Sequence, residues 1–156
     1  MTGYSGTPLS KKLGLEEGQR IRFVGAPDHF RDLIGPLPPG SEMTDGLSGT
    51  LDLAVMFAGS QQVLENGLGE IAARLAPNGA LWVAWPKKSS GVATDLDFEA
   101  VQRTGLDAGL VDNKVCAIDE TWSGLRFVFR VGDRPATGGQ RPHAKIAPDR
   151  ERGGMG

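Results

Sequence analysis

The sequence predicts an α/β fold, with a mostly parallel sheet, helices on both faces and an antiparallel hairpin at the end. Strand-like and helix-like segments alternate along the chain, which is typical of parallel sheets. The segment LDLAVMF at 51–57 is almost continuously apolar, as in a strand that is buried on both faces. Two further strand-like segments flank a short turn, DETWSG, and this spacing predicts the hairpin.

The first three elements are short. A helix is expected over 7–14, because Thr7 can cap its start and Gly14 can end it. Arginines alternate with apolar side chains over 20–24, which predicts a strand. A second short helix is expected over 27–35. Its apolar positions are Phe30, Leu33 and Ile34.

A loop rich in proline and glycine follows, with one short strand expected around Glu42 and Met43. A buried strand over 51–59 comes next. Ser60 can cap a helix that continues to about Leu75, where the sequence PNG ends it. The inner face of this helix is expected to carry Val63, Leu64, Leu68, Ile71 and Leu75.

Apolar residues at 80–85 predict another strand. Trp82 and Trp85 are an odd number of positions apart, so they should face opposite sides of the sheet. Thr94 or Asp95 can cap the helix that follows. The apolar positions of that helix are Phe98, Val101 and Leu106.

The hairpin strands are expected at 111–118 and 125–131, with Trp122 in the turn between them. From this turn, Trp122 can either fold back onto the core or cover a pocket. We expect these elements to form one domain over 1–131. The remaining residues, 132–156, have few apolar side chains and many glycines, prolines and charges, which predicts a disordered tail.

Length, charge and composition restrict the function. The 156 residues suit a domain with a sizeable core, and the net charge of −2 gives no overall attraction to nucleic acid or to a membrane. Neither a run of about 18 apolar residues nor an apolar leader segment is found, so we expect a cytoplasmic protein. The single cysteine, Cys116, excludes a disulfide framework within the chain, and no metal site is predicted.

The segment IAARLAPNGALWVAW at 71–85 resembles the helix, glycine turn and strand of class I methyltransferases. A parallel run that ends in an antiparallel hairpin is also their pattern, so the resemblance implies a Rossmann-like, methyltransferase-like sheet. Methyltransferases of this class carry a glycine-rich loop after the first strand, where the backbone approaches adenosylmethionine, and usually an acidic residue after the second. Here the first loop is GAPDHF at 25–30, with a single glycine, so binding of adenosylmethionine in the usual manner is not expected and the cofactor stays unknown.

A second resemblance covers residues 1–131. The strings GYSGTPLSKKLG, WVAWPKKSSGVATDL and GLVDNKVCAIDETWSGLRFV are similar to motifs of a small bacterial family, the domain of unknown function 3052. This resemblance implies no particular activity.

The candidate ligand site lies at the strand ends, because open α/β sheets bind ligands beyond the carboxyl ends of their strands. Three predicted strand ends carry small, charged or hydroxyl residues, and adjacent ends would join them in one crevice. These candidate residues are Gly25, Asp28, Gly59, Ser60, Lys87, Lys88, Ser89 and Ser90. Lysines, hydroxyls and helix N-termini favour an anion such as phosphate or carboxylate. The alternative is that PKKSSG is only a solvated turn.

Three further features could carry chemistry, and each has a plainer explanation. Asp119 and Glu120 are adjacent carboxylates, but a hairpin turn commonly carries such residues for solubility. Cys116 could act as a nucleophile only beside a base such as His29, and in mid-strand it is expected to be a small buried hydrophobe. His29 with Asp28 is an incomplete metal or acid–base pair.

The leading interpretation is a non-catalytic or degenerate methyltransferase-like module that binds an anionic or nucleotide-like small molecule at the strand ends. One alternative is an active small-molecule enzyme, namely an atypical methyltransferase. Another is a protein-interaction adaptor that uses the fold as a scaffold.

Overall fold

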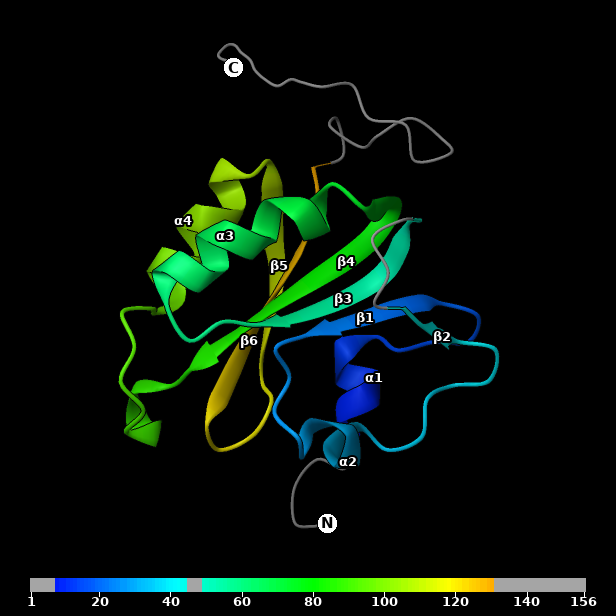
Figure 1. Ribbon diagram of the computed structural model, residues 1–156, viewed down its shortest axis with the longest axis horizontal. Coiled ribbons are helices and arrows are strands. Elements are labelled where there is room, and N and C mark those ends of the chain that lie inside the picture. The colour runs from blue at the N-terminus through cyan, green and yellow to red at the C-terminus, as the bar shows by residue number, and fades with distance from the viewer. Residues whose placement is uncertain (1–7, 45–48, 131–156) are drawn as a thin grey trace.

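The computed structural model describes residues 8–44 and 49–130. Its elements in chain order are α1 (Leu9–Leu13), β1 (Arg20–Val24), α2 (Phe30–Ile34), β2 (Glu42–Met43), β3 (Leu51–Phe57), α3 (Gln61–Ala72), β4 (Leu75–Pro86), η1 (Lys88–Ser90), α4 (Phe98–Asp107), β5 (Leu110–Ala117) and β6 (Trp122–Phe129). The strands form one six-stranded sheet in the order β2-β1-β3-β4-β6-β5, in which only β6 runs antiparallel to its neighbours. Helices α3 and α4 cover one face, and α1 and α2 cover the other (Figure 1). The predicted fold class is confirmed.

The first part of the chain follows the prediction closely. Pro8 takes the N-cap position of α1, and the predicted cap, Thr7, lies outside the described residues. Leu33 of α2 is 41% exposed, because five residues make little more than one turn and only Phe30 and Ile34 face the core. The short strand β2 pairs with β1 at two residues only.

The end of α3 differs most from the sequence prediction. The helix ends at Ala72 and not near Leu75, and Val63 is 48% exposed instead of lying on the inner face. Leu75 begins β4, where it pairs with Leu51 of β3 before the register shifts. A Cβ atom on Gly79 would lie only 2.9 Å from the Leu51 carbonyl oxygen. Pairing with β3 therefore takes the residues PNG into the strand, where periodicity alone predicted a helix end.

The start of α4 also differs. Asp97 caps this helix, since its carboxylate accepts a hydrogen bond from the backbone N–H of Ala100 at 2.8 Å. The predicted caps, Thr94 and Asp95, instead contact the start of α3. Of the predicted apolar positions only Val101 is fully buried, while Phe98 and Leu106 are about two-fifths exposed at 40% and 38%.

Trp122 lies in a strand and not in the hairpin turn. It is the first residue of β6 and pairs with Pro86 of β4. Its ring meets the ring of Phe57 edge to face, with centroids 5.0 Å apart. Of the two alternatives, Trp122 therefore folds back onto the core.

Two apolar clusters fill the space on either side of the sheet. Trp85 belongs to the cluster under α3 and α4, and Trp82 to the cluster under α1 and α2, as their spacing predicted. The indole N–H of the fully buried Trp82 donates a hydrogen bond to the Leu13 carbonyl oxygen at 2.8 Å, which ties α1 to the sheet.

Replacing Trp82 by phenylalanine is expected to lower the free energy of unfolding by about 2 kcal/mol, because it removes volume and leaves the Leu13 carbonyl without its donor. Urea unfolding measures this loss. Trp85→Phe is the matched control, since within the described part of the chain its indole N–H has no hydrogen-bond partner. Equal losses in the two variants would contradict the role given to the hydrogen bond.

No helix within residues 8–44 and 49–130 is long and apolar enough to cross a membrane. The tail predicted over 132–156 lies outside the described residues.

Candidate functional site

The carboxyl ends of β1, β3 and β4 lie side by side, because these strands are consecutive in the sheet. We call this region the carboxyl edge and define it as residues 25–29, 58–60 and 87–91 (Figure 1). The strand order that the predicted site required is therefore present.

Gly25 has a structural reason to be a glycine. Its φ of +69° lies in the left-handed region, and a Cβ atom there would be 2.9 Å from the Phe57 carbonyl oxygen. The end of β1 thus packs directly against the end of β3. Asp28, just beyond, is exposed. Gly59 is exposed as well, and its carbonyl oxygen accepts a hydrogen bond from the Thr94 hydroxyl at 2.8 Å.

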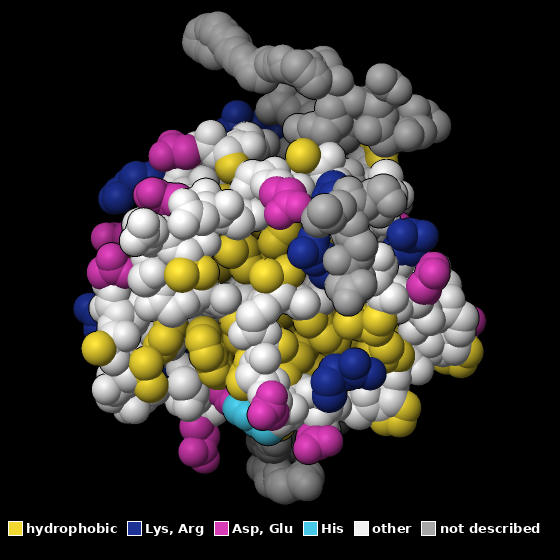
Figure 2. All heavy atoms as spheres, viewed as in Figure 1, with side chains coloured by type: hydrophobic (Ala, Val, Ile, Leu, Met, Phe, Trp, Pro, Cys, Tyr) yellow, Lys and Arg dark blue, Asp and Glu magenta, His cyan; other side chains and the backbone are white. Residues whose placement is uncertain are grey.

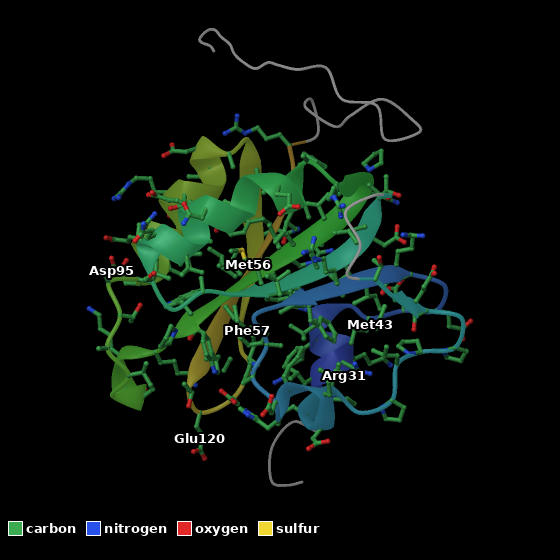
Figure 3. The ribbon with its side chains drawn as sticks, in the orientation of Figure 1. Arg31, Met43, Met56, Phe57, Asp95 and Glu120 are labelled. Atoms are coloured by element: carbon green, nitrogen blue, oxygen red, sulfur yellow. The ribbon has the colours of Figure 1, made fainter. Side chains whose placement is uncertain are left out.

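The start of α3 already holds a carboxylate from the chain itself. Ser60 caps the helix as predicted, since its hydroxyl oxygen accepts a hydrogen bond from the Val63 N–H at 3.2 Å. Asp95 reaches the same helix end and accepts a hydrogen bond from the Gln61 N–H at 2.8 Å (Figure 3). The favourable interaction of a helix N-terminus with negative charge is therefore used internally. Two N–H groups at this helix end are therefore already bonded within the chain, and a role of Ser60 in ligand binding stays a prediction.

The two lysines that follow β4 are held in a tight turn. The Lys87 backbone N–H donates to the Thr121 carbonyl oxygen at 2.8 Å, which joins the turn to the β5–β6 hairpin. Ser90 donates its hydroxyl to the Lys87 carbonyl oxygen at 2.6 Å, so this hydroxyl serves the turn itself. Lys88 and Ser89 are exposed, and Lys87 is half-buried. Among the described residues, neither lysine ammonium has a carboxylate within 4.0 Å.

Sequence reasoning missed the pairing of His29 with Asp119 at this edge. The Nε2 atom of His29 lies 2.8 Å from Oδ2 of Asp119, although three strands separate β1 from β5 in the sheet. The other carboxylate oxygen of Asp119 accepts hydrogen bonds from the N–H groups of Thr121 and Trp122, both at 2.8 Å. Both residues follow the carboxyl ends of parallel strands, and this was the only signal in the sequence. Asp28 and Glu120 make no such contact within the described part of the chain.

The surroundings of Asp119 favour its ionised form. Burial alone would raise the pKa of the carboxyl group, but the hydrogen bonds from His29, Trp122 and Thr121 outweigh that effect. The pKa of Asp119 therefore lies below its ordinary value.

Asp119→Asn is expected to reduce stability by about 1 kcal/mol at neutral pH and by less in acid. Because the folded-state pKa is depressed, the ionised carboxylate stabilises the fold above the ordinary pKa of about 4. This contribution disappears as the pH falls through the folded-state pKa. Urea unfolding at pH 7 and pH 3 measures the difference. Glu120→Gln is the control, and a pH-independent loss in Asp119→Asn would contradict this account.

A row of four aromatic rings lies beneath the carboxyl edge. Phe23, Phe30, Phe57 and Trp122 meet edge to face in that order, with centroid distances of 4.9, 4.9 and 5.0 Å. Figure 2 shows a band of apolar side chains across this side of the molecule, with a histidine and acidic side chains at its lower rim. The buried side chain of Phe57 lies below the end of β3 (Figure 3). The carboxyl edge thus combines a largely buried layer of aromatic side chains with exposed polar groups.

Within residues 8–44 and 49–130, no hydrogen bond joins Cys116 to a histidine or a carboxylate. The thiol is half-buried against the core below α1 and α2, close to its predicted role as a small hydrophobe. Burial raises the pKa of the thiol, and the nearby charges of Lys12 and Lys114 offset this only in part. His29, the one candidate base in the sequence analysis, is bound to Asp119 instead. Within the described ranges, no three histidine, cysteine or acidic side chains are grouped to hold a metal ion.

Comparison with solved structures identifies the class of fold. The chain superposes on a precorrin-6y methyltransferase from Geobacter metallireducens with a TM-score of 0.53 and 10% identity, covering 78% of this chain and 86% of that one. It is also similar to a ribosomal-protein methylase from Lactobacillus delbrueckii subsp. bulgaricus, with a TM-score of 0.51, 8% identity and coverage of 79% and 75%. A third match is magnesium protoporphyrin IX methyltransferase from Synechocystis, with a TM-score of 0.50, 10% identity and 78% coverage of both chains.

The fold is therefore that of class I methyltransferases, Rossmann-like and α/β. At these identities the likeness extends to the fold alone. No family model matches the chain, and no curated protein matches it, so membership of the domain of unknown function 3052 stays a prediction.

The residues at the carboxyl edge do not fit adenosylmethionine in the manner usual for this fold. The loop after β1 contains one glycine, and that glycine is packed against the Phe57 backbone. The strand β2 is only two residues long, and Glu42 in it pairs with Arg20 at 3.6 Å.

Proposed function

We propose that this protein is a degenerate methyltransferase-like module that binds a small anionic or nucleotide-like ligand at the carboxyl edge without catalysing methyl transfer. The observation that carries the proposal is the position of Lys87 and Lys88. They follow the central strand β4 at the edge where folds of this kind bind ligands, and no carboxylate neutralises them among the described residues.

The degenerate character is supported by the packing of the edge. The contact between Gly25 and the Phe57 carbonyl leaves no room for a side chain where the strands β1 and β3 end. At the start of α3, Asp95 supplies a negative charge that a bound anion would otherwise supply. An external anion would therefore depend on the lysines.

The nucleotide-like character is supported by the aromatic residues beneath the edge. Trp122 is half-buried, and the backbone of the neighbouring Thr121 is bonded to Lys87. A ligand that joins an anionic group to a planar ring would combine lysine contacts with aromatic contacts.

A thermal-shift panel of inorganic phosphate, AMP and ATP tests the proposal. A ligand of the folded state at 100 times its Kd adds about 2.7 kcal/mol of stability, which is a rise of several degrees in Tm. We expect this rise for at least one of the three compounds. Unchanged melting at millimolar concentrations of all three would contradict the proposal.

The second candidate is an atypical methyltransferase, which the fold favours. Calorimetric titration with adenosylmethionine and adenosylhomocysteine separates it from the binding module. Micromolar binding of either compound would favour the enzyme, and no heat at high concentration would favour the module.

A further inference from the structure

The pair formed by His29 and Asp119 has an asymmetric environment. The Asp119 side chain is 18% exposed, whereas the His29 side chain is 54% exposed. The Nε2 atom of His29 faces the carboxylate at 2.8 Å. Within residues 8–44 and 49–130, its Nδ1 atom has no hydrogen-bond partner. A largely buried carboxylate thus holds one nitrogen of an imidazole whose side chain is half-exposed.

Three hydrogen bonds fix the carboxylate that holds His29. Two of them come from the backbone N–H groups of Thr121, in the hairpin turn, and of Trp122, the first residue of β6, and they immobilise Oδ1. Oδ2 then remains as the acceptor for His29. In neutral histidine one nitrogen is a donor and the other an acceptor, so a carboxylate at Nε2 leaves Nδ1 as the acceptor.

The hairpin turn also joins His29 to the other parts of the carboxyl edge. Thr121 accepts the Lys87 backbone N–H at 2.8 Å, and the Trp122 ring packs on the Phe57 ring. The segment 119–122, which comprises the hairpin turn and the first residue of β6, therefore contacts the ends of β3 and β4 as well as the loop after β1. A ligand held by the lysines would lie beside the same turn that holds His29.

We propose that His29 is a hydrogen-bond acceptor at the carboxyl edge, that Asp119 is its positioning residue, and that the ligand is a small anion that also carries a hydroxyl or amino group. The ligand O–H or N–H donates a hydrogen bond to Nδ1, and Asp119 holds the imidazole in the tautomer in which Nδ1 is the acceptor. The identity of the ligand rests on the proposed function, but the orientation of His29 does not.

Chemical modification of the full-length chain tests the orientation without any ligand. Diethyl pyrocarbonate acylates unprotonated imidazole, and peptide mass spectrometry follows His29 and His143, the only two histidines, in one sample. Relative to His143, we expect modification of His29 to slow about threefold in Asp119→Asn, as for loss of an orienting carboxylate, and to stay unchanged in Glu120→Gln. An unchanged or faster rate in Asp119→Asn would overturn the positioning role.

Two probes that share one anion test the ligand class. Glycerol 3-phosphate carries hydroxyl groups, and methyl phosphate carries none beyond its phosphate. In calorimetry we expect His29→Ala to weaken glycerol 3-phosphate about fivefold, as for loss of one hydrogen bond, with little change for methyl phosphate. Equal effects on both probes would overturn the inference and leave the lysine site standing. If neither probe binds the unmodified protein, both the lysine site and the proposed ligand class are wrong. The orientation of His29 is then tested by the modification experiment alone.

Discussion

Replacing Gly105 by alanine is expected to lower the free energy of unfolding by about 2 kcal/mol, the cost of overpacking less the gain in helix propensity. Gly105 is buried in α4, and a Cβ atom there would overlap the ring of Phe127 on β6. Phe127 is fully buried, so its ring cannot move aside without disturbing the core under α3 and α4. For a chain of this size, thermal unfolding should show a fall of about 5 °C in Tm.

Gly69→Ala is the matched control for this prediction. Gly69 lies in α3 and is exposed, and apart from its chain neighbours and the backbone of its own helix no atom lies within 4 Å of the position that a Cβ would take. Alanine there is expected to stabilise the protein by about 0.5–1 kcal/mol through helix propensity. A double variant, Gly105→Ala with Phe127→Leu, should recover part of the loss. Equal changes in the free energy of unfolding for Gly69→Ala and Gly105→Ala would contradict the packing described for α4.

Replacing Lys87 and Lys88 together by alanine is expected to weaken binding of the anionic ligand about tenfold, because two charge-assisted contacts are lost. Both lysines follow β4 and have no carboxylate partner in the described ranges. The fold should be retained, since the turn is held through backbone atoms of Lys87 and the hydroxyl of Ser90. Calorimetry with the ligand identified in the thermal-shift panel measures the change in Kd.

The control for the lysine pair removes the same charge elsewhere. Lys11 in α1 and Arg103 in α4 are exposed and lie outside the carboxyl edge. The double variant Lys11→Ala with Arg103→Ala should bind the ligand nearly as well as the unmodified protein. If both double variants weaken binding equally, only net charge matters, and the site assignment is wrong.

Much of the fold could be predicted because it depends on local patterns. The largely apolar β3, the alternation in β1 and the spacing of Trp82 and Trp85 all gave correct predictions. The errors occur where pairing with a distant segment determines the secondary structure. Leu75 joins a strand because Leu51 pairs with it, and Trp122 joins β6 because Pro86 lies opposite.

The contacts of the candidate site were harder to predict for the same reason. The sequence placed Gly25, Ser60 and Lys87 at three strand ends, and the strand order makes those ends adjacent. Spacing cannot show that Asp95 would bond to the first N–H of α3 or that Asp119 would reach His29, because each contact depends on how two loops fold back.

Backbone amide NMR during a titration with AMP tests the central claim most directly. The claim is that an anionic ligand binds at the carboxyl edge, formed by residues 25–29, 58–60 and 87–91. We expect saturable shifts in amides of 87–91 and of the adjoining segment 119–122, with small changes in α1 and in the middle of α4. No saturable shifts, or shifts confined to parts of the chain away from this edge, would contradict the account.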